Sequence, residues 1–245
     1  MENERASLYG LINRISDTIR GYNKIMEEDR YYELTDETIE FDGHTLHRIR
    51  YAKDFLNITK GTLGGFVECY ENLCGEAWVG DDAKVYAGAV VKDRAFVGGD
   101  ACVSNCAVIA ERASVEDSAS VCGVVWIGGN AAIHDLAVIR QGSYLPLEIN
   151  GYTKIGGNAV IKSAYDYIVF KNWWSSGRYF TWTRSNDMWR VGCFYGTGKE
   201  LIAKAYKDSK VSGREYERVV KYVEQIKRDS KPSLWQRVKK MLTGK

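Results

Sequence analysis

The sequence LCGEAWVGDDAKVYAGAVVKDRAFVGGDACVSNCAVIAERASVEDSASVCGVVWIGGNAAIHDLAVIRQGSY, residues 73–144, decides the fold of this chain. An aliphatic residue recurs in it every six positions, at Leu73, Val79, Val85, Val91, Val97, Val103, Ile109, Val115, Val121, Ile127, Ile133 and Ile139. Four positions after each of them stands a small residue, in most cases alanine: Ala77, Ala83, Ala89, Ala95, Ala101, Ala107, Ala113, Ala119, Val125, Ala131, Ala137 and Ser143. A helix has a period of about 3.6 residues and a strand a period of about 2, so neither explains a period of six. A six-residue repeat is typical of a β-helix.

Each repeat supplies one short strand and one corner, so three repeats complete a coil of about eighteen residues. We expect the aliphatic residue to point into the prism and the small residue to line the corner, where a larger side chain does not fit. The pattern is interrupted after Tyr144 and resumes at Ile155 and Ile161. The interval from Leu145 to Lys154 is one repeat plus about four residues, which predicts a short loop there and five to six coils in all.

Two features of the repeats resemble known proteins. The aliphatic residue is often followed by Gly or Asp, as in residues 79–83 (VGDDA) and 127–131 (IGGNA). Over residues 61–164 the chain therefore resembles the hexapeptide-repeat family, which implies a left-handed parallel β-helix. The segments 32–39 (YELTDETI) and 63–68 (LGGFVE) resemble the N-terminal cap of hexapeptide-repeat proteins common in phage and prophage genomes. This second resemblance implies a phage or mobile-element origin.

The repeats divide a mainly β chain into four parts. We expect an N-terminal amphipathic helix in residues 1–30, a β cap in 31–72, the β-helix in 73–164 and a small α+β domain in 165–245. The helix follows from a single apolar stripe with spacings of three and four residues: Leu8, Ile12, Ile15, Ile19, Tyr22 and Met26. This helix either packs on the rest of the chain or pairs with a second subunit.

Turn and capping signals organise the two end regions. In the cap, Asp42-Gly43 between alternating segments predicts a hairpin. In the C-terminal region, aromatic and β-branched segments between 167 and 195 predict a three-stranded antiparallel sheet. Capping boxes then predict helices that begin after Thr197 and after Ser212, and Pro232 predicts the start of a third helix.

Composition excludes several classes of protein. No apolar run approaches the ~20 residues that cross a membrane, and residues 1–5 lack the features of a signal peptide, so a cytoplasmic location is expected. The six cysteines form no CxxC pair, which argues against disulfides and zinc. Residues 199–245 carry fourteen Lys and Arg against six Asp and Glu. This basic region suits an acidic partner and leaves contact with nucleic acid open.

One cluster of residues could carry catalysis. Spacing of eighteen places Glu116 over His134 and Asp117 over Asp135 on adjacent coils. Hexapeptide-repeat acyltransferases use a histidine as general base, so the resemblance makes His134 the candidate base, oriented by Glu116, with acetyl-CoA or another acyl-CoA as cofactor. The alternative is an ordinary surface histidine beside solvated acids. The unbroken repeats also lack the long extruded loop that these enzymes usually carry.

Outward-facing columns of apolar residues indicate a binding surface. Val90, Val108, Trp126 and Tyr144 are spaced by eighteen, and Trp78 and Phe96 form a second stack. Such strips mark interfaces, either between subunits of a dimer or trimer or between parts of one chain. We therefore expect Trp126 to be buried in the native protein.

These observations support two hypotheses of function. The first is a non-catalytic protein-binding protein of phage or mobile-element origin that engages a host protein, such as a bacterial defence component that it inhibits. It needs no cofactor and no metal, and its binding residues would include the apolar columns with Asp117 and Asp135. The second is an acyl-CoA-dependent acyltransferase. Since one fold serves many functions, the repeats alone do not choose between them.

Overall fold

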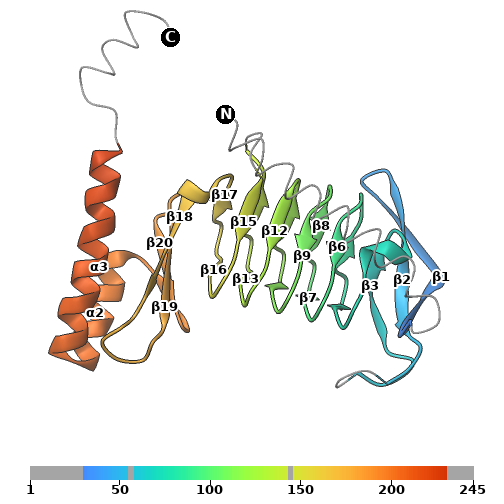
Figure 1. The fold of residues 1–245 in the computed structure, drawn as a ribbon, viewed down its shortest axis with the longest axis horizontal. Coiled ribbons are helices and arrows are strands. Elements are labelled where there is room, and N and C mark those ends of the chain that lie inside the picture. Colours follow the sequence, from blue (N-terminus) through green and yellow to red (C-terminus); the bar gives the residue numbers. More distant parts are fainter. Residues whose placement is uncertain (1–29, 55–57, 143–145, 231–245) are drawn as a thin grey trace, which may run out of the picture.

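The computed structural model describes residues 30–54, 58–142 and 146–230, which form a parallel β-solenoid of about five coils with a β hairpin at one end and an α+β unit at the other (Figure 1). The solenoid has three walls. The first contains β3 (Leu63–Val67), β5 (Lys84–Val85), β8 (Cys102–Ser104), β11 (Ser120–Cys122), β14 (Val138–Arg140) and β17 (Val160–Ile161). The second contains β4 (Trp78–Val79), β7 (Phe96–Val97), β10 (Ser114–Val115), β13 (Ala132–Ile133) and β16 (Lys154–Ile155). The third contains β6 (Val90–Val91), β9 (Val108–Ile109), β12 (Val125–Ile127) and β15 (Leu147–Ile149).

The register of the strands confirms the coil length. Phe96 pairs with Ser114, and Ser114 pairs with Ala132, so each step between coils is eighteen residues. The last step is longer, because Trp126 pairs with Glu148. The four additional residues therefore lie between β14 and β15. The prediction of a loop within 145–154 was wrong, because that interval contains β15 and most of the following corner.

This register also changes the predicted apolar column. Glu148, a charged residue, occupies the position in the third wall that the sequence pattern gave to Tyr144. Tyr144 itself lies outside the described residues. The column of Val90, Val108 and Trp126 therefore ends at a carboxylate.

Inside the solenoid, the predicted aliphatic residues and alanines are buried and form one continuous core. The corners explain the Gly and Asp preference. The second residue after most aliphatic positions adopts positive φ, for example 53° at Asp81, 67° at Gly99 and 59° at Asp117. Gly, Asn and Asp tolerate this conformation best. The corner carboxylates also accept the backbone N–H of the next coil, as Asp117 does from Asp135 at 2.9 Å.

The β cap closes the first coil. β1 (Tyr32–Phe41) and β2 (His44–Tyr51) form the predicted antiparallel hairpin around Asp42-Gly43, and β2 pairs with β3. The Tyr32 hydroxyl donates to the Leu73 carbonyl oxygen at 2.8 Å, next to the short 3₁₀ helix Tyr70–Asn72. The cap therefore shields both the strand edge and the open end of the core. The predicted N-terminal helix lies outside the described residues.

The C-terminal unit has one strand more than predicted. β18 (Tyr167–Lys171), β19 (Tyr179–Thr183), β20 (Met188–Val191) and β21 (Phe194–Gly196) form a four-stranded antiparallel sheet, which the 3₁₀ turn Ala164–Asp166 joins to the solenoid. One face of it packs on α2 (Gly198–Asp208) and α3 (Lys210–Asp229) around Trp182 and Trp189. The described helices include none that is long and apolar enough to span a membrane.

One of the two predicted capping boxes is present in the structure and the other is not. Thr197 and Glu200 form the predicted capping box of α2. The second predicted box was wrong, because Ser209 caps α3 by accepting the N–H of Ser212 at 3.0 Å. The helix therefore begins three residues earlier than predicted and follows α2 with no loop between them. The predicted third helix lies outside the described residues.

The sheet also caps the last coil of the solenoid. The N–H of Lys154 donates to Thr181 Oγ1 at 3.0 Å, and the N–H of Val160 donates to Ser185 Oγ at 2.7 Å. Both donors belong to strands of the final coil, which would otherwise present unpaired groups to water. Side chains of β19 and of the turn after it thus end the repeat and join the two units.

Candidate functional site

The candidate general base, His134, lies at the junction of the solenoid and the C-terminal sheet. Its Nδ1 atom is 2.9 Å from Nη2 of Arg190 on β20 and 3.0 Å from Oδ2 of Asp135. The same Arg190 nitrogen donates to Asp135 Oδ2 at 2.7 Å. Asp135 Oδ2 also accepts the N–H of Gly157 at 2.7 Å. His134 is thus a member of a three-residue cluster that ties two units together.

Two tautomers of the neutral His134 ring fit these contacts. Both short contacts use Nδ1, which carries either a hydrogen or a lone pair. With the hydrogen on Nδ1 the ring donates to Asp135 and Nε2 is a potential base, whereas with the hydrogen on Nε2 the Nδ1 atom accepts from Arg190. In both cases Arg190 donates to Asp135, and the role of His134 as a general base stays a prediction.

The surroundings of His134 favour the neutral form of its ring. Burial, followed by the positive charge of Arg190, lowers the pKa of His134, although Asp135 opposes the shift. Burial alone would raise the pKa of Asp135, but the Gly157 N–H, His134 and Arg190 together lower it. At neutral pH the cluster therefore consists of a neutral imidazole, a carboxylate and a guanidinium.

The lowered pKa of His134 predicts a pH dependence of stability. The unfolded chain takes up a proton on this residue near pH ~6.5, whereas the folded chain resists it. We expect the free energy of unfolding to fall as the pH decreases below about 6.5, by at most ~1.4 kcal/mol per pH unit. His134→Gln should remove this part of the slope. Urea denaturation of both proteins between pH 7 and pH 5 tests this prediction, and equal slopes for wild type and His134→Gln would contradict a lowered pKa of His134.

The predicted orienting residue, Glu116, occupies the position equivalent to His134 one coil earlier, since Val115 pairs with Ile133. Among the described residues, the hydrogen bonds of His134 go to Arg190 and Asp135 rather than to Glu116. Asp117 and Asp135 serve as corner residues of the solenoid, each accepting a backbone N–H of the next coil. The structure thus stacks the predicted residues and gives the carboxylates a structural role.

The same residues are the one group among the described residues whose donor set could suit a cation. Ligand atoms of Asp117, His134 and Asp135 lie within 4.8 Å of one another. However, the guanidinium of Arg190 already contacts both His134 Nδ1 and Asp135 Oδ2. A divalent cation would have to displace this arginine, so the donor set fits an ion pair better than a metal.

A groove of about 970 Å³ lies beside this cluster. The solenoid contributes the exposed side chains of Asp117, Leu136 and Asn158, and the sheet contributes Met188 and Tyr195. The Tyr195 ring lies 4.9 Å from the guanidinium carbon of Arg190. The groove is open and contains polar and apolar groups, but none of these contacts activates a nucleophile.

The predicted aromatic stack on the second wall is partly covered. Trp78 packs against Tyr51 of the cap, with ring centroids 5.1 Å apart, and edge-on against Phe96 at 6.4 Å. Each ring also lies over the glycine two residues later, because a Cβ atom on Gly98 would meet the Phe96 ring at 2.3 Å. Each ring therefore covers the backbone of its own coil.

The column on the third wall is buried. Val90, Val108 and Trp126 form one cluster with Cys74 and Ala110. Trp126 is 9% exposed, which confirms the expectation that it is buried. Three of the residues predicted as binding surface, Val90, Val108 and Trp126, are therefore buried, and their role in binding stays a prediction.

No protein-family model matches the sequence, and no curated protein matches it. The resemblance to hexapeptide-repeat proteins therefore stays a prediction for membership of the family and for phage origin.

The sequence analysis missed the most exposed aromatic surface. Trp173 is 81% exposed and follows β18, and Tyr152 is 51% exposed on the last coil. Tyr152 stacks on Tyr179 with centroids 4.8 Å apart, and the Lys171 ammonium lies 5.8 Å from the Tyr179 ring. We call Tyr152, Lys171 and Tyr179, together with the exposed Trp173 two residues after Lys171 in the chain, the aromatic patch. The run of two tryptophans at 173–174 was the available signal, because only Trp174 fits the core of the unit.

Proposed function

We propose that this chain is a non-catalytic protein-binding protein whose C-terminal unit carries the binding surface and whose solenoid is a rigid support. The observation that carries the proposal is the aromatic patch. Trp and Tyr are enriched in the centres of protein interfaces, where they account for much of the binding free energy. Large exposed aromatics are costly to leave bare in water, and their clustering marks an interaction site.

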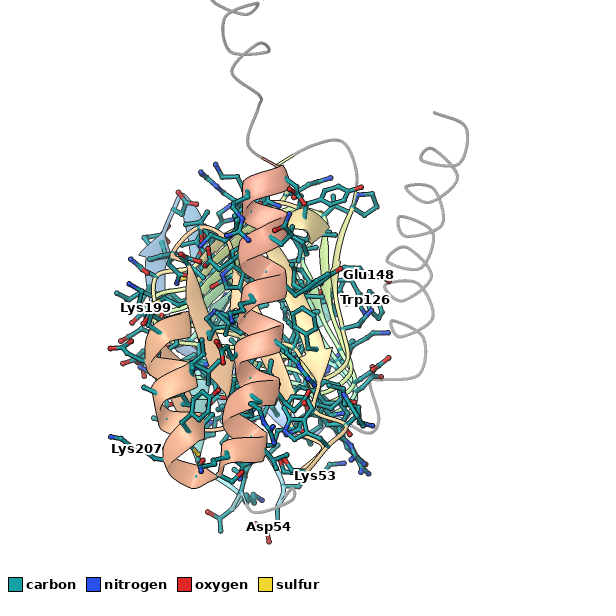
Figure 2. The ribbon with its side chains drawn as sticks, turned by 90° about the vertical axis from the view of Figure 1, so that its left-hand side faces the viewer. Lys53, Asp54, Trp126, Glu148, Lys199 and Lys207 are labelled. Atoms are coloured by element: carbon teal, nitrogen blue, oxygen red, sulfur yellow. The ribbon has the colours of Figure 1, made fainter. Side chains whose placement is uncertain are left out.

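Charge indicates the kind of partner. Lys171 belongs to the patch, and Lys154 is exposed on the same last coil. Lys199 and Lys207 lie on α2, on the side of the molecule opposite to Trp126 (Figure 2). An acidic partner would complement the lysines of the patch and of the last coil. The same charges leave contact with nucleic acid as an outcome of the experiment below.

The origin of the partner rests on the sequence resemblance alone. If the chain comes from a phage or another mobile element, its partner is a protein of the bacterial host, and a defence component that the chain inhibits is the natural candidate.

Substitution in the patch tests the proposal. We expect the wild-type chain, used as bait in a bacterial lysate, to retain a stable partner, and Trp173→Asp to reduce the affinity for it by at least about tenfold. The matched control is Tyr165→Asp, which changes an equally exposed aromatic (80%) at the other end of β18. Binding measured by calorimetry with the purified partner gives the comparison.

Two results would contradict the proposal. The first is a partner that binds wild type, Trp173→Asp and Tyr165→Asp equally, which would place the interface elsewhere. The second is retention of nucleic acid instead of protein, lost after nuclease treatment.

The acyltransferase alternative makes the opposite prediction for a simple ligand. A ligand that binds the folded state raises the melting temperature by mass action. We expect acetyl-CoA at millimolar concentration to leave the melting temperature of this chain unchanged. A reproducible rise, abolished by His134→Ala, would restore the acyltransferase hypothesis.

A further inference from the structure

A buried apolar strip follows the outer surface of the third wall. It consists of Cys74, Val90, Val108, Ala110 and Trp126, and it is separate from the core inside the solenoid. Its residues alternate with the inward residues of the wall, so their side chains point away from the prism. Trp126 and Glu148, on neighbouring strands, lie on the same side of the molecule (Figure 2).

The burial of this strip requires a cover. Val138 and Val160 point outward from the first wall and are partly exposed, whereas Val108 points outward from the third wall and is fully buried. A wall one strand thick cannot by itself hide its outward side chains. Among the described residues, the strip contacts its own members, Val124 and the Lys92 ammonium, which lies 4.9 Å from the Trp126 ring.

We propose that residues 6–28 of the same chain form an amphipathic helix that lies along this strip. The apolar stripe of this helix would pack on the apolar strip, and it consists of Leu8, Ile12, Ile15, Ile19, Tyr22 and Met26. The described chain begins at Arg30 and places Tyr32 against Leu73, with its hydroxyl 2.8 Å from the Leu73 carbonyl oxygen. Leu73 bridges Val91 at the start of the third wall and immediately precedes Cys74. The N-terminal segment therefore joins the described chain at one end of the strip.

The lengths are compatible. Three steps between coils separate Cys74 from Trp126, about 14 Å at ~4.8 Å per step. A helix over residues 6–28 is about 34 Å long at ~1.5 Å per residue. Three turns of it are enough to cover the strip, and an isolated helix of this length is marginal in water unless its apolar face packs. The helix would thus cover the strip, and the strip would provide the apolar surface against which the helix packs.

The alkylation rate of the Cys74 thiol measures whether this contact forms. Its thiol is buried in the strip, and burial raises its pKa to about 12, so it should react slowly with iodoacetamide. Cys106 and Cys193 are exposed and serve as internal references. In the full chain carrying Ile12→Asp and Ile15→Asp, we expect the alkylation rate of Cys74, measured by peptide mass spectrometry, to rise by at least about tenfold. The rates at both references should not change.

Matched variants separate this cover from its competitors. Asn13→Asp with Gly10→Asp adds the same two charges on the polar face and should leave Cys74 protected. Val238→Asp with Met241→Asp, in the other segment outside the described residues, should also leave it protected. Protection lost on dilution would show that a second copy is the cover, and protection lost in the Val238 and Met241 variant would show that the C-terminal segment is. Either result, or unchanged protection with Ile12→Asp and Ile15→Asp, overturns the proposal.

Global unfolding is distinguished by a second reading. Cys102 is half-buried on the first wall, away from the strip. If the Ile12 and Ile15 variant unfolded the solenoid, Cys102 would react faster together with Cys74. The proposal predicts a change at Cys74 alone, with an unchanged circular dichroism spectrum.

Discussion

Replacement of Ile127 by aspartate is expected to lower the free energy of unfolding by about 4 kcal/mol or more. Ile127 is fully buried inside the solenoid, stacked between Ile109 and Ile149 of the neighbouring coils. A carboxylate there would lose its hydration and would face aliphatic side chains on every coil. Urea denaturation followed by circular dichroism measures the loss, and failure to fold at all agrees with it.

Two controls show whether position or chemistry causes the effect. Ile127→Val removes one methylene from the same site and should cost only about 1 kcal/mol. Ala132→Asp introduces the same charge at an outward position of the second wall, next to Lys154, and should change stability by less than about 0.5 kcal/mol. A wild-type stability for Ile127→Asp would contradict the assignment of the interior to the six-residue repeat.

The solenoid could be predicted because each coil requires the same residue types within six neighbouring positions of the sequence. Most corners repeat the same requirement, a small residue inside and a residue at positive φ that is usually Gly, Asp or Asn, and the requirement recurs every six residues. Asp81, Gly99 and Asp117 are successive examples on one corner. Where each coil repeats the previous one, the sequence period and the register of the ladder are the same information.

The sequence analysis placed the four-residue insertion within residues 145–154 because Leu145 and Ile149 both fit the pattern of inward aliphatic residues. Leu145 follows Ile139 by six residues and continues the period, whereas Ile149 follows it by ten. Only the pairing of Ile127 with Ile149 shows which aliphatic residue enters the core. A local pattern cannot decide between them, since the choice depends on how the next coil closes.

The candidate site was predictable only in part, for a related reason. The eighteen-residue period correctly placed Glu116 beside His134 and Asp117 beside Asp135. It could not reveal Arg190, which lies 56 residues from His134 in the sequence and belongs to the sheet that caps the last coil. No period links the two units, so the sequence pattern could not show that Arg190 contacts the histidine.

Arg190 is expected to be the most important single residue at the junction of the two units. Its guanidinium donates to Asp135, contacts His134 Nδ1 and lies over Tyr195. Arg190→Met keeps the apolar stem but removes the donors, and leaves Asp135 with His134 Nδ1 and the Gly157 N–H as its partners. We expect a loss of about 2–3 kcal/mol in the free energy of unfolding, the usual range for hydrogen bonds to a charged group.

A double-mutant cycle between Arg190→Met and Asp135→Asn tests whether these residues act as one cluster. Residues that share hydrogen bonds show a coupling of about 0.5–3 kcal/mol, whereas independent residues add. Asp81→Asn is the matched control, because the Asp81 carboxylate accepts the Gly99 N–H at the same corner of an earlier coil, while the nearby Arg48 donates to the Asp81 backbone carbonyl oxygen and not to the carboxylate. We therefore expect Arg190→Met to couple with Asp135→Asn and to be additive with Asp81→Asn. Additivity in both cycles would mean that Asp135 serves only its corner and that the junction is held by other contacts, such as those from Thr181 and Ser185 to the last coil.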